Sequence, residues 1–536
     1  MAAIVVQEHD DIDPAVHAHR WWILGVLVIS LTVIIMDNTI LNVAIPSLVR
    51  GLDASNSQLQ WIIDSYTIVF AGLLLTAGSL SDKFGRKGAL QAGIVLFCCG
   101  SAMSAMATSA TELIGTRAFM GIGGALIMPS TLSLLTNTFR DPRERGRAIA
   151  IWAGFSALGV ALGPLVGGFL LRHFSWSSVF WVNIPIGIIA LVAGIFLLPT
   201  SRDQTDTKLD PLGSVLSIIG LASLLYGVIE VPDKGWSDPK VIAGFVLGVL
   251  GIVAFILWEL HSDHPMLDMK FFKNPRFTAA NLAITLTFFA MFGSLFLMTQ
   301  YWQFVHEYTP LEAGIRLIPY AMGMMIAAPI SARMVERHGS KRVITFGLSV
   351  MTIALVSLSF LRVETPYPIA IIPFFIVAIG MGFTMPPATE SIMGSLPRDK
   401  AGVGSAVNDT TRQMGGAVGV ALIGSVVSSI FASHIDTAAA QYGVNGADLA
   451  EARASLGGAL RVGESMANNA VAFVDAAKES FVTGLSWGLR LASVFVLFAA
   501  YVVVRYLPSN ASLHDRVPAA SDEEMVSLAN AVSAGE

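Results

Sequence analysis

Apolar stretches long enough to cross a lipid bilayer recur along this 536-residue chain and constrain its fold more than any other feature. A helical span needs about 20 apolar residues, and a backbone that meets lipid must be helical because no water is present to satisfy its polar groups. The sequence therefore predicts an all-α integral membrane protein with 14 transmembrane helices. We expect these helices near residues 22–46, 58–79, 88–107, 112–134, 147–170, 177–198, 211–230, 241–260, 277–301, 313–334, 342–361, 367–389, 402–430 and 480–506.

The composition agrees with this assignment and excludes several other classes. Charged residues make up 13% of the chain, against about 25% in soluble domains. The two cysteines are adjacent, so they have neither disulfide nor metal-ligand spacing, and no basic cluster indicates nucleic acid. Lys and Arg concentrate in the loops that follow every second helix, which predicts that both termini are cytoplasmic. The expected location is a bacterial inner (cell) membrane, crossed many times.

Two loops resemble each other and indicate a duplicated unit. GSLSDKFGRKGAL (78–90) and SARMVERHGSKRVI (331–344) both place an acid, a basic residue and Gly before a basic pair. Transporters are often built from such repeats. We expect an N-terminal tail (1–20), a six-helix bundle (21–198), two linker helices (199–270), a second six-helix bundle (271–508) and a C-terminal tail (509–536). Within the second bundle, 431–478 is predicted to be an external loop, either a solvated flap or, in 447–463, an amphipathic helix.

The first of these loops combines residues with distinct physical roles. Gly78 lets two helices approach closely, and Gly85 allows a tight turn. Asp82 can bond a helix N-terminus or an arginine, while Arg86 and Lys87 are expected to anchor the loop at the anionic leaflet. The loop matches the signature of the major facilitator superfamily. That resemblance implies two six-helix bundles, here with two extra helices between them, and a loop that closes the cytoplasmic side.

Two further stretches resemble motifs of the same superfamily. GFSALGVALGPLVGGFL (154–170) places Gly159, Gly163, Pro164 and Gly167 at the spacing of close helix packing, and it resembles the antiporter motif associated with exporters. Ordinary helix packing is the alternative. LIGTRAFMGIGGA (113–125) resembles a motif linked to proton transfer, which implies a role in proton coupling for Arg117.

Charges inside the expected spans are the candidate functional residues. At 1.5 Å per residue, Asp37, Asp64 and Arg117 share the outer third of the first bundle, so we expect them to line one cavity. Wet helix ends, or a structural Asp37–Arg117 ion pair, are the alternatives. Asp409 and Arg412 are three residues apart and can share a helix face, either as a local ion pair or with Asp409 protonating or meeting substrate. Two other acids, Glu230 and Glu390, are expected at wet helix ends.

Four segments sharpen the resemblance to the fourteen-helix drug:proton antiporters, the multidrug and quaternary-ammonium exporters. They are MDNTILNVAIP (36–46), QWIIDSYTIVFAG (60–72), SWSSVFWVNIPIG (175–187) and AGVGSAVNDTTRQMGGAVGVALIGSV (401–426). By this resemblance Asp37 and Asp64 match acids of that branch, and Asp409 matches one member of an acidic pair. Asn408 and Met324 stand where that branch can carry further acids. Monovalent cations or neutral amphiphiles are therefore expected rather than dications.

The expected function is proton-coupled multidrug efflux by alternating access. The coupling proton is expected to bind a carboxylate, with Asp37 as the first candidate and Asp64 and Asp409 as the next. A drug pocket favours soft and aromatic walls, and the substrate-binding candidates are Tyr66, Trp152, Phe155, Tyr301, Trp302, Met324 and Arg412. The expected partners are amphiphilic drugs, protons and the bilayer, with no nucleic acid, no cofactor, no metal and a monomeric chain. A dedicated exporter of one metabolite, lipid or self-made antibiotic is the alternative. A membrane enzyme is not expected, because the ten histidines form no HExxH-type pair.

Overall fold

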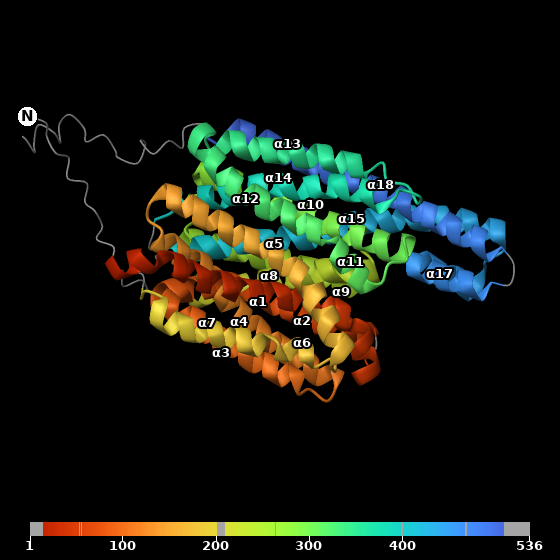
Figure 1. Ribbon diagram of the computed structural model, residues 1–536, viewed down its shortest axis with the longest axis horizontal. Coiled ribbons are helices and arrows are strands. Elements are labelled where there is room, and N and C mark those ends of the chain that lie inside the picture. Colours follow the sequence, from red (N-terminus) through yellow and green to blue (C-terminus); the bar gives the residue numbers. More distant parts are fainter. Residues whose placement is uncertain are drawn as a thin grey trace, which may run out of the picture.

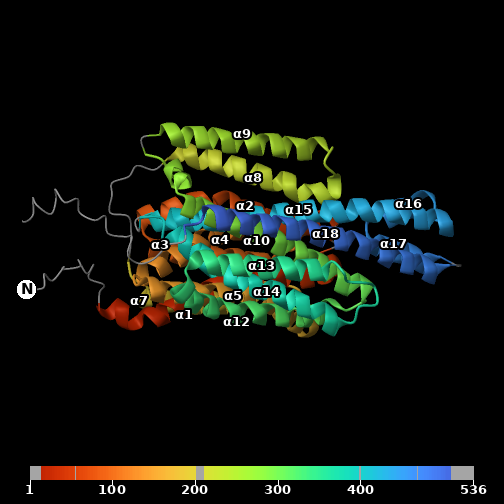
Figure 2. The same cartoon turned by 90° about the horizontal axis from the view of Figure 1, so that it is seen from above.

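The computed structural model describes residues 14–52, 54, 56–200, 210–262, 264–397, 400–466 and 469–508. Every regular element in these ranges is a helix, and the long helices run side by side (Figures 1 and 2). Residues 1–13, the predicted C-terminal tail 509–536 and most of the loop between the first bundle and the linker helices, 201–209, lie outside the described residues.

The helices fall into three consecutive groups. The N-terminal half contains α1 (Pro14–Leu52), α2 (Asn56–Phe84), α3 (Arg86–Ala105), α4 (Ala110–Thr138), α5 (Pro142–His173), α6 (Ser178–Trp181) and α7 (Asn183–Leu197). The linker pair is α8 (Pro211–Lys234) and α9 (Pro239–His261). The C-terminal half contains η1 (Met269–Lys273), α10 (Pro275–Gln300), η2 (Tyr301–Val305), α11 (Pro310–Arg316), α12 (Ile318–His338), α13 (Ser340–Leu358), α14 (Tyr367–Met393), α15 (Ala401–Tyr442), α16 (Gly446–Ala454), α17 (Leu456–Ser465) and α18 (Ala470–Tyr506).

The described residues contain 14 candidate membrane spans, which confirms the predicted number. Local sequence sets where several of them begin. The Ser109 side chain caps α4 by accepting from the backbone of Glu112, and Asp141 caps α5 directly before Pro142. A side-chain oxygen at this position satisfies one of the backbone N–H groups that the first helical turn leaves open, and proline fits there because it has no N–H to lose.

The two halves repeat the same packing. In the N-terminal half α1 packs on α4, α5 and α7, while α2 and α3 pack on α4. In the C-terminal half α10 packs in the same way on α14, α15 and α18, while α12 and α13 pack on α14. The two related loops turn at equivalent glycines with positive φ, 109° at Gly85 and 78° at Gly339. The sequence repeat therefore has a counterpart in the structure.

The linker helices α8 and α9 form a tight pair beside the two halves (Figure 2). Glycines face each other along this pair: a Cβ on Gly251 would lie 2.7 Å from the Cα of Gly220, and one on Gly244 would lie 3.0 Å from that of Gly227. Helix α8 packs on both α2 and α15. The pair lies between the halves in sequence, and in space it covers the seam between one helix of each half.

The segment 431–478 is largely helical where the structure describes it. Helix α15 continues to Tyr442 and ends at Gly443, whose φ is 79°, while α16 and α17 occupy most of the segment expected to be amphipathic. These elements extend beyond the ends of the other helices (Figure 1). Surface ion pairs join Arg453 to Asp436 at 3.2 Å and Arg461 to Glu451 at 2.8 Å. The predicted loop is therefore an ordered helical projection.

Candidate functional site

A buried ion pair joins Asp37 of α1 to Arg117 of α4. Arg117 Nη1 donates to Asp37 Oδ2 over 2.5 Å, and neither side chain is exposed. Asn183, the first residue of α7, donates to Asp37 Oδ1 over 2.7 Å and to Ser101 Oγ over 3.1 Å. Both oxygens of the Asp37 carboxylate are thus satisfied, as a charge enclosed in a membrane bundle requires.

The other face of the Arg117 guanidinium meets an aromatic ring. Its central carbon lies 4.4 Å from the ring centroid of Tyr66, a cation–π distance. Gly124 lies directly against the Tyr66 hydroxyl, because a Cβ there would be 2.6 Å from that oxygen. Among the described residues, Arg117 Nη2, Tyr66 Oη and Asn183 Oδ1 are buried without a hydrogen-bond partner. The site therefore retains unused hydrogen-bonding capacity beside a charged pair.

The structure brings together two of the three charges expected in one outer cavity. Asp37 and Arg117 are in direct contact, whereas Asp64 lies half-buried on α2. The described hydrogen bonds of Arg117 go to Asp37, to the carbonyl of Ile62 and to the sulfur of Met120. A shared cavity for Asp64 thus stays a prediction.

Sequence reasoning missed Asn183 and Ser101 as members of this site. Both are buried, and Ser101 Oγ donates to the carbonyl of Phe180 over 2.8 Å, which links α3 to α6. The segment 175–187 supported only the family resemblance. An amide side chain within an apolar span was the available signal, since such groups rarely enter a membrane without a partner.

A second buried polar cluster lies on α15 and reaches across to α5. Arg412 Nη1 lies 3.4 Å from Asp409 Oδ1, and Arg412 Nη2 donates to Thr389 Oγ1 over 3.0 Å. The guanidinium carbon of Arg412 also lies 4.8 Å from the ring of Trp152 and 5.3 Å from that of Phe288. Trp152 belongs to the N-terminal half, so this cation–π contact bridges the two halves.

The second carboxylate oxygen of Asp409 is buried without a partner among the described residues, and so is Arg412 Nε. Asn408, which stands where the family resemblance allows an acid, donates to Asp409 Oδ1 over 3.3 Å. The local ion pair between Asp409 and Arg412, one of the two alternatives for these residues, is therefore present. It leaves one carboxylate oxygen and one guanidinium N–H open to another group.

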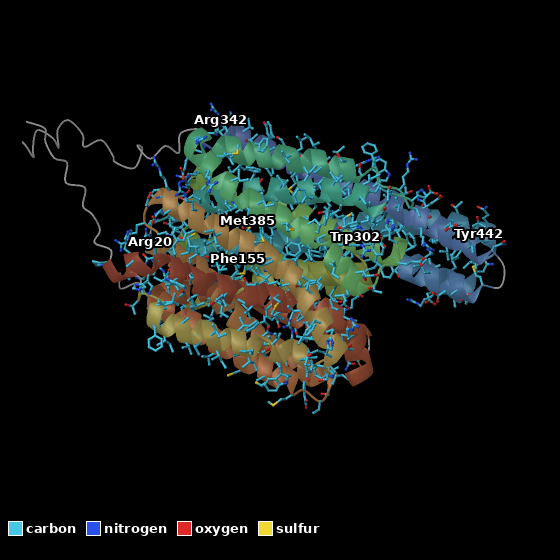
Figure 3. The ribbon with its side chains drawn as sticks, viewed as in Figure 1. Arg20, Phe155, Trp302, Arg342, Met385 and Tyr442 are labelled. Atoms are coloured by element: carbon cyan, nitrogen blue, oxygen red, sulfur yellow. The ribbon has the colours of Figure 1, made fainter. Side chains whose placement is uncertain are left out.

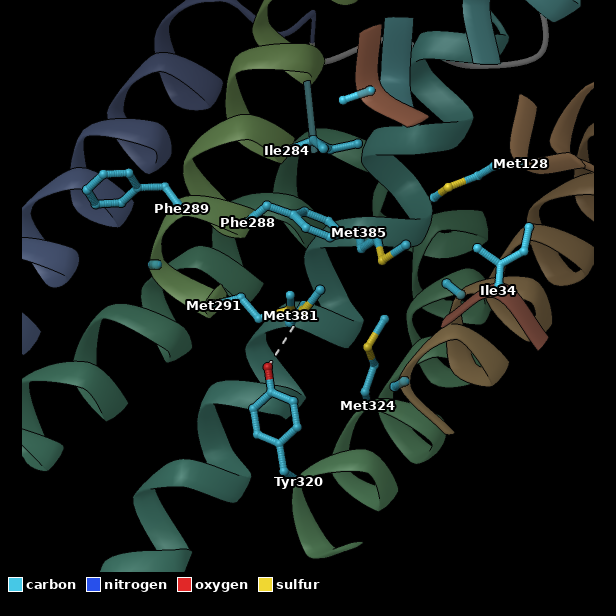
Figure 4. Close-up of a cluster of buried hydrophobic side chains, with 14 of the residues drawn as sticks. Ile34, Met128, Ile284, Phe288, Phe289, Met291, Tyr320, Met324, Met381 and Met385 are labelled. Atoms are coloured by element: carbon cyan, nitrogen blue, oxygen red, sulfur yellow. Dashed lines mark hydrogen bonds between the residues drawn. The ribbon is translucent and has the colours of Figure 1, made fainter. Parts of the chain in front are cut away.

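Methionines gather between the halves next to this cluster (Figure 4). Met324, Met381 and Met385 come from α12 and α14, and Met128 comes from α4 of the N-terminal half. The Tyr320 hydroxyl points at the Met381 sulfur, 3.7 Å away. Flexible, polarizable thioether side chains can adapt to different apolar shapes. Met324, one of the residues expected to bind substrate, thus lies among other methionines that could contact an apolar compound.

The remaining aromatic candidates occupy two other places. Tyr301 and Trp302 are fully buried in η2, where the Tyr301 hydroxyl donates to the carbonyl of Arg362 over 2.7 Å and the Trp302 ring meets that of Phe374 at 5.5 Å. Phe155 is 36% exposed on α5 (Figure 3). The expected set of rings is therefore not one continuous wall.

The predicted cytoplasmic loop connects the halves through Asp82. Its carboxylate accepts from the backbone N–H groups of Gly402 over 2.8 Å and Val403 over 3.0 Å, at the start of α15. A negative charge is favourable at a helix N-terminus. Gly78 makes the approach possible, because a Cβ there would lie 2.6 Å from the Gly402 carbonyl oxygen. The helix-terminus role expected for Asp82 is realised.

The expectation for Arg86 was wrong. It is 2% exposed and bonds Asp82 at 2.9 Å, so it holds the carboxylate in place and does not reach the lipid headgroups. Lys87 donates to the carbonyl of Ile195 over 2.8 Å. Gly85 makes the expected turn with its positive φ.

Two further ion pairs cross between the halves at the same end. Arg145 of α5 binds Glu390 of α14 with two hydrogen bonds, 2.9 Å from Nε to Oε2 and 2.5 Å from Nη2 to Oε1. Arg147 of α5 donates to Glu336 of α12 over 3.0 Å. Glu390 was expected in a wet helix end, but its side chain is 11% exposed and paired. Near the opposite end of the bundle Glu230 is also buried, and Lys234 pairs with it at 2.5 Å.

The glycines of the predicted antiporter motif lie along α1. A Cβ on Gly159 would lie 3.0 Å from the Cβ of Ile35, and one on Gly167 would lie 2.7 Å from Ile40 Cγ1. Gly163 faces Thr39 more closely still. These glycines thus let α5 pack directly on the helix that carries Asp37. Pro164 lies on the other side, against Gly314 of α11.

Nothing in the described part of the chain resembles a metal centre, since no group of three or more His, Cys, Asp or Glu side chains is placed to hold an ion. Asp37 and Arg412 are instead each the centre of a buried cluster of hydrogen-bonded polar side chains. Both clusters touch helices that reach the seam between the halves.

Comparison with known proteins identifies the family. The sequence profile of the Major Facilitator Superfamily matches residues 27–420. The chain belongs to this superfamily. The crystal structure of the human organic anion transporter MFSD10 (TETRAN) has the same fold, with a TM-score of 0.59 and 12% identity over 92% of this chain and 100% of that one. The protein is thus a multi-pass membrane transport protein.

Relatives in this superfamily carry names that refer to drug export or resistance. The multidrug efflux pump LfrA of Mycolicibacterium smegmatis is 35% identical over 90% of this chain and 95% of its own length. The methyl viologen resistance protein SmvA of Salmonella typhimurium is 31% identical over 90% and 97%. The tetracenomycin C resistance and export protein of Streptomyces glaucescens is 29% identical over 90% and 91%.

Proposed function

We propose that this transporter is a proton-coupled exporter of hydrophobic or cationic amphiphilic compounds, antibiotics among them, and that it works by alternating access. The observation that carries the proposal is the enclosed Asp37–Arg117 pair with Asn183 on its second carboxylate oxygen. Charges inside membrane bundles are costly and mark the paths of ions and protons. The printed names of the relatives support drugs as the cargo.

In this proposal the proton acts at Asp37. Protonation removes the negative charge and leaves Arg117 without its ion partner, so the pair must rearrange. The partnerless Tyr66 hydroxyl and the second Arg117 amino group offer new hydrogen bonds nearby. The change can pass along α1 to α5, which packs on α1 through its glycines and on α12 of the other half.

The cargo would bind between the halves, beside Arg412 and the methionines. A cationic ring system can stack on Trp152 in the place that the Arg412 guanidinium occupies, while Asp409 offers its open oxygen to the positive charge. The site has one available acid, so it suits monovalent cations and neutral amphiphiles.

The same proposal assigns the remaining parts of the chain. The end that carries Asp82 faces the cytoplasm of a bacterial inner membrane, and both termini lie on that side. The bundles 21–198 and 271–508 rock about the seam, the linker helices of 199–270 stay at its edge, and the projection 431–478 is external. The chain works as a monomer.

The test is uphill transport by the purified protein in proteoliposomes. With the release side acidic, a panel of a cationic dye, a tetracycline, a β-lactam and an aminocyclitol should show several accumulated compounds, and a protonophore should abolish accumulation. Asn183→Leu should move the pH profile of transport, whereas Asn445→Leu, at an exposed position, should not. Accumulation of the same amount of compound with and without the pH gradient would refute proton coupling.

A dedicated exporter is the second candidate, because several relatives, the methyl viologen resistance protein among them, are named for one compound each. Besides the tetracenomycin C protein, the methylenomycin A resistance protein of Streptomyces coelicolor is 33% identical over 74% of this chain and 83% of its own length. Accumulation of a single compound from the panel would favour this reading over multidrug export.

A further inference from the structure

A cavity of about 350 Å³ opens between three helix ends, at the end of the molecule that carries Asp82. Its lining consists of Trp21 of α1, Arg147 and Ile151 of α5, and Pro329 and Arg333 of α12. Two guanidinium groups thus face one space, and none of the described residues that line it is an acid. Figure 3 labels Arg20, the neighbour of Trp21 in the sequence, and Phe155, four residues after Ile151 on α5.

The two arginines belong to different halves and have different surroundings. Arg147 donates to Glu336, with about half of its side chain exposed (51%). Within the described part of the chain Arg333 makes no ion pair, and it is exposed. The cavity therefore carries net positive charge that the protein only partly balances.

On both helices an apolar residue lies one turn deeper than the arginine. Ile151 follows Arg147 by four residues on α5, and Pro329 precedes Arg333 by four on α12, which runs the opposite way. Residues four apart share a helix face. The cavity is therefore charged at its mouth and apolar towards the bilayer interior, with the half-exposed Trp21 ring at its side, where aromatic rings favour the membrane interface.

We propose that this cavity binds an anionic phospholipid of the surrounding leaflet, with Arg147 and Arg333 on the phosphodiester and the acyl chains along Ile151 and Pro329. Guanidinium groups bind phosphate through paired N–H donors, and basic pockets between membrane helices suit anionic headgroups. Because Arg147 and Arg333 lie on opposite sides of the seam, the bound lipid bridges the two halves beside the Arg147–Glu336 pair. This inference does not rest on proton coupling or on drug export.

The test is native mass spectrometry of the full-length protein titrated with dioleoyl phosphatidylglycerol. Each arginine near an anionic headgroup contributes about fivefold in affinity, so Arg147→Gln/Arg333→Gln should weaken binding of the first lipid by about 25-fold. Arg337→Gln/Arg342→Gln removes the same charge from exposed positions outside the cavity and should leave that affinity unchanged. Arg147→Lys/Arg333→Lys keeps the charge and loses the paired donors, so its affinity should lie between those of the parent and the glutamine variant.

Two further experiments identify the molecule that binds in the cavity. Dioleoyl phosphatidylcholine should not form the high-affinity adduct, and excess glycerol phosphate should not displace phosphatidylglycerol. A photoactivatable phosphatidylglycerol should crosslink to peptides that contain 147–151 or 329–333. Equal binding by the cavity and control variants, equal affinity for phosphatidylcholine, or displacement by glycerol phosphate would each overturn the proposal, the last by assigning the site to a soluble phosphate.

Discussion

Breaking the Arg145–Glu390 ion pair should open the end of the protein at which it lies. The pair joins α5 to α14 through two hydrogen bonds, and its side chains are 4% and 11% exposed. Glu390→Gln removes the charge and retains the shape, so it leaves the Arg145 guanidinium buried without an ion partner.

The expected effect follows from this burial. Removing one partner of a buried pair costs about 3–5 kcal/mol, and the slight exposure of Glu390 places the effect near the lower bound. A cost of about 3 kcal/mol corresponds to roughly a 150-fold change in an equilibrium constant. If the closed arrangement exceeds the open one by about 100-fold in the parent, the variant should populate both states substantially.

The assay is double electron–electron resonance with one spin label in each half. Gly88→Cys on α3 and Arg342→Cys on α13 are exposed positions near this end, and Cys98→Ser with Cys99→Ser removes the native thiols. Glu390→Gln should add a population with a longer label distance. Arg145→Gln/Glu390→Gln should add less of it, because neither partner is then a lone buried charge.

The result that would refute this reasoning is a distance distribution in Glu390→Gln that matches the parent. Equal opening in the single and double variants would also contradict it, since the effect would then not come from an uncompensated charge. Glu336→Gln is a milder comparison, because the Arg147–Glu336 pair is more exposed and surface pairs contribute only about 0–1 kcal/mol.

Two further predictions concern packing and pH. Gly78→Val places side-chain atoms where a Cβ alone would lie 2.6 Å from the Gly402 carbonyl oxygen. This overpacking should cost about 1–3 kcal/mol and lower both the melting temperature and the efflux rate. Gly88→Ala has open space around it and should change neither. Burial, and then the positive charges of Lys478 and Arg316, lower the pKa of His306 below 6.5. Stability should therefore fall as the pH drops below the pKa of the unfolded state, because the unfolded chain takes up the proton more readily than the folded one. Between about pH 7.5 and 5.5 the melting temperature of His306→Gln should fall less than that of the parent, and an equal fall in both would contradict this.

Helix periodicity and depth were enough to predict most of the membrane architecture. Fourteen apolar stretches give 14 candidate spans because each span must satisfy its own backbone. Counting 1.5 Å per residue along antiparallel helices placed Asp37 and Arg117 at one depth, and the structure brings them into contact. The same counting places Asp64 at a similar depth, but depth gives no direction around the helix axis, so a shared cavity for Asp64 stays a prediction.

Contacts between the two halves could not be predicted from the sequence pattern. Glu390 lies close to a helix end, which indicates exposure, but the ends of α5 and α14 converge and Arg145 covers it. The amide of Asn183 lies within an apolar span, but it carries no charge and was a weaker signal than the charged residues. The segment 431–478 was predicted to be an external loop, although α15 meets no strong break before Gly443, which adopts positive φ. The first two cases depend on tertiary packing, which overrides a local pattern.

Proton movement at Asp37 is the central claim, and the most direct measurement is the proton flux that accompanies drug flux in proteoliposomes. A pH-sensitive dye on the release side and a fluorescent cationic substrate report both fluxes at once. The parent and Asp448→Asn, which removes an exposed acid of α16, should move protons in a fixed ratio to drug. Asp37→Asn should lose drug-dependent proton flux and uphill transport together, and an unchanged ratio in Asp37→Asn would contradict the account.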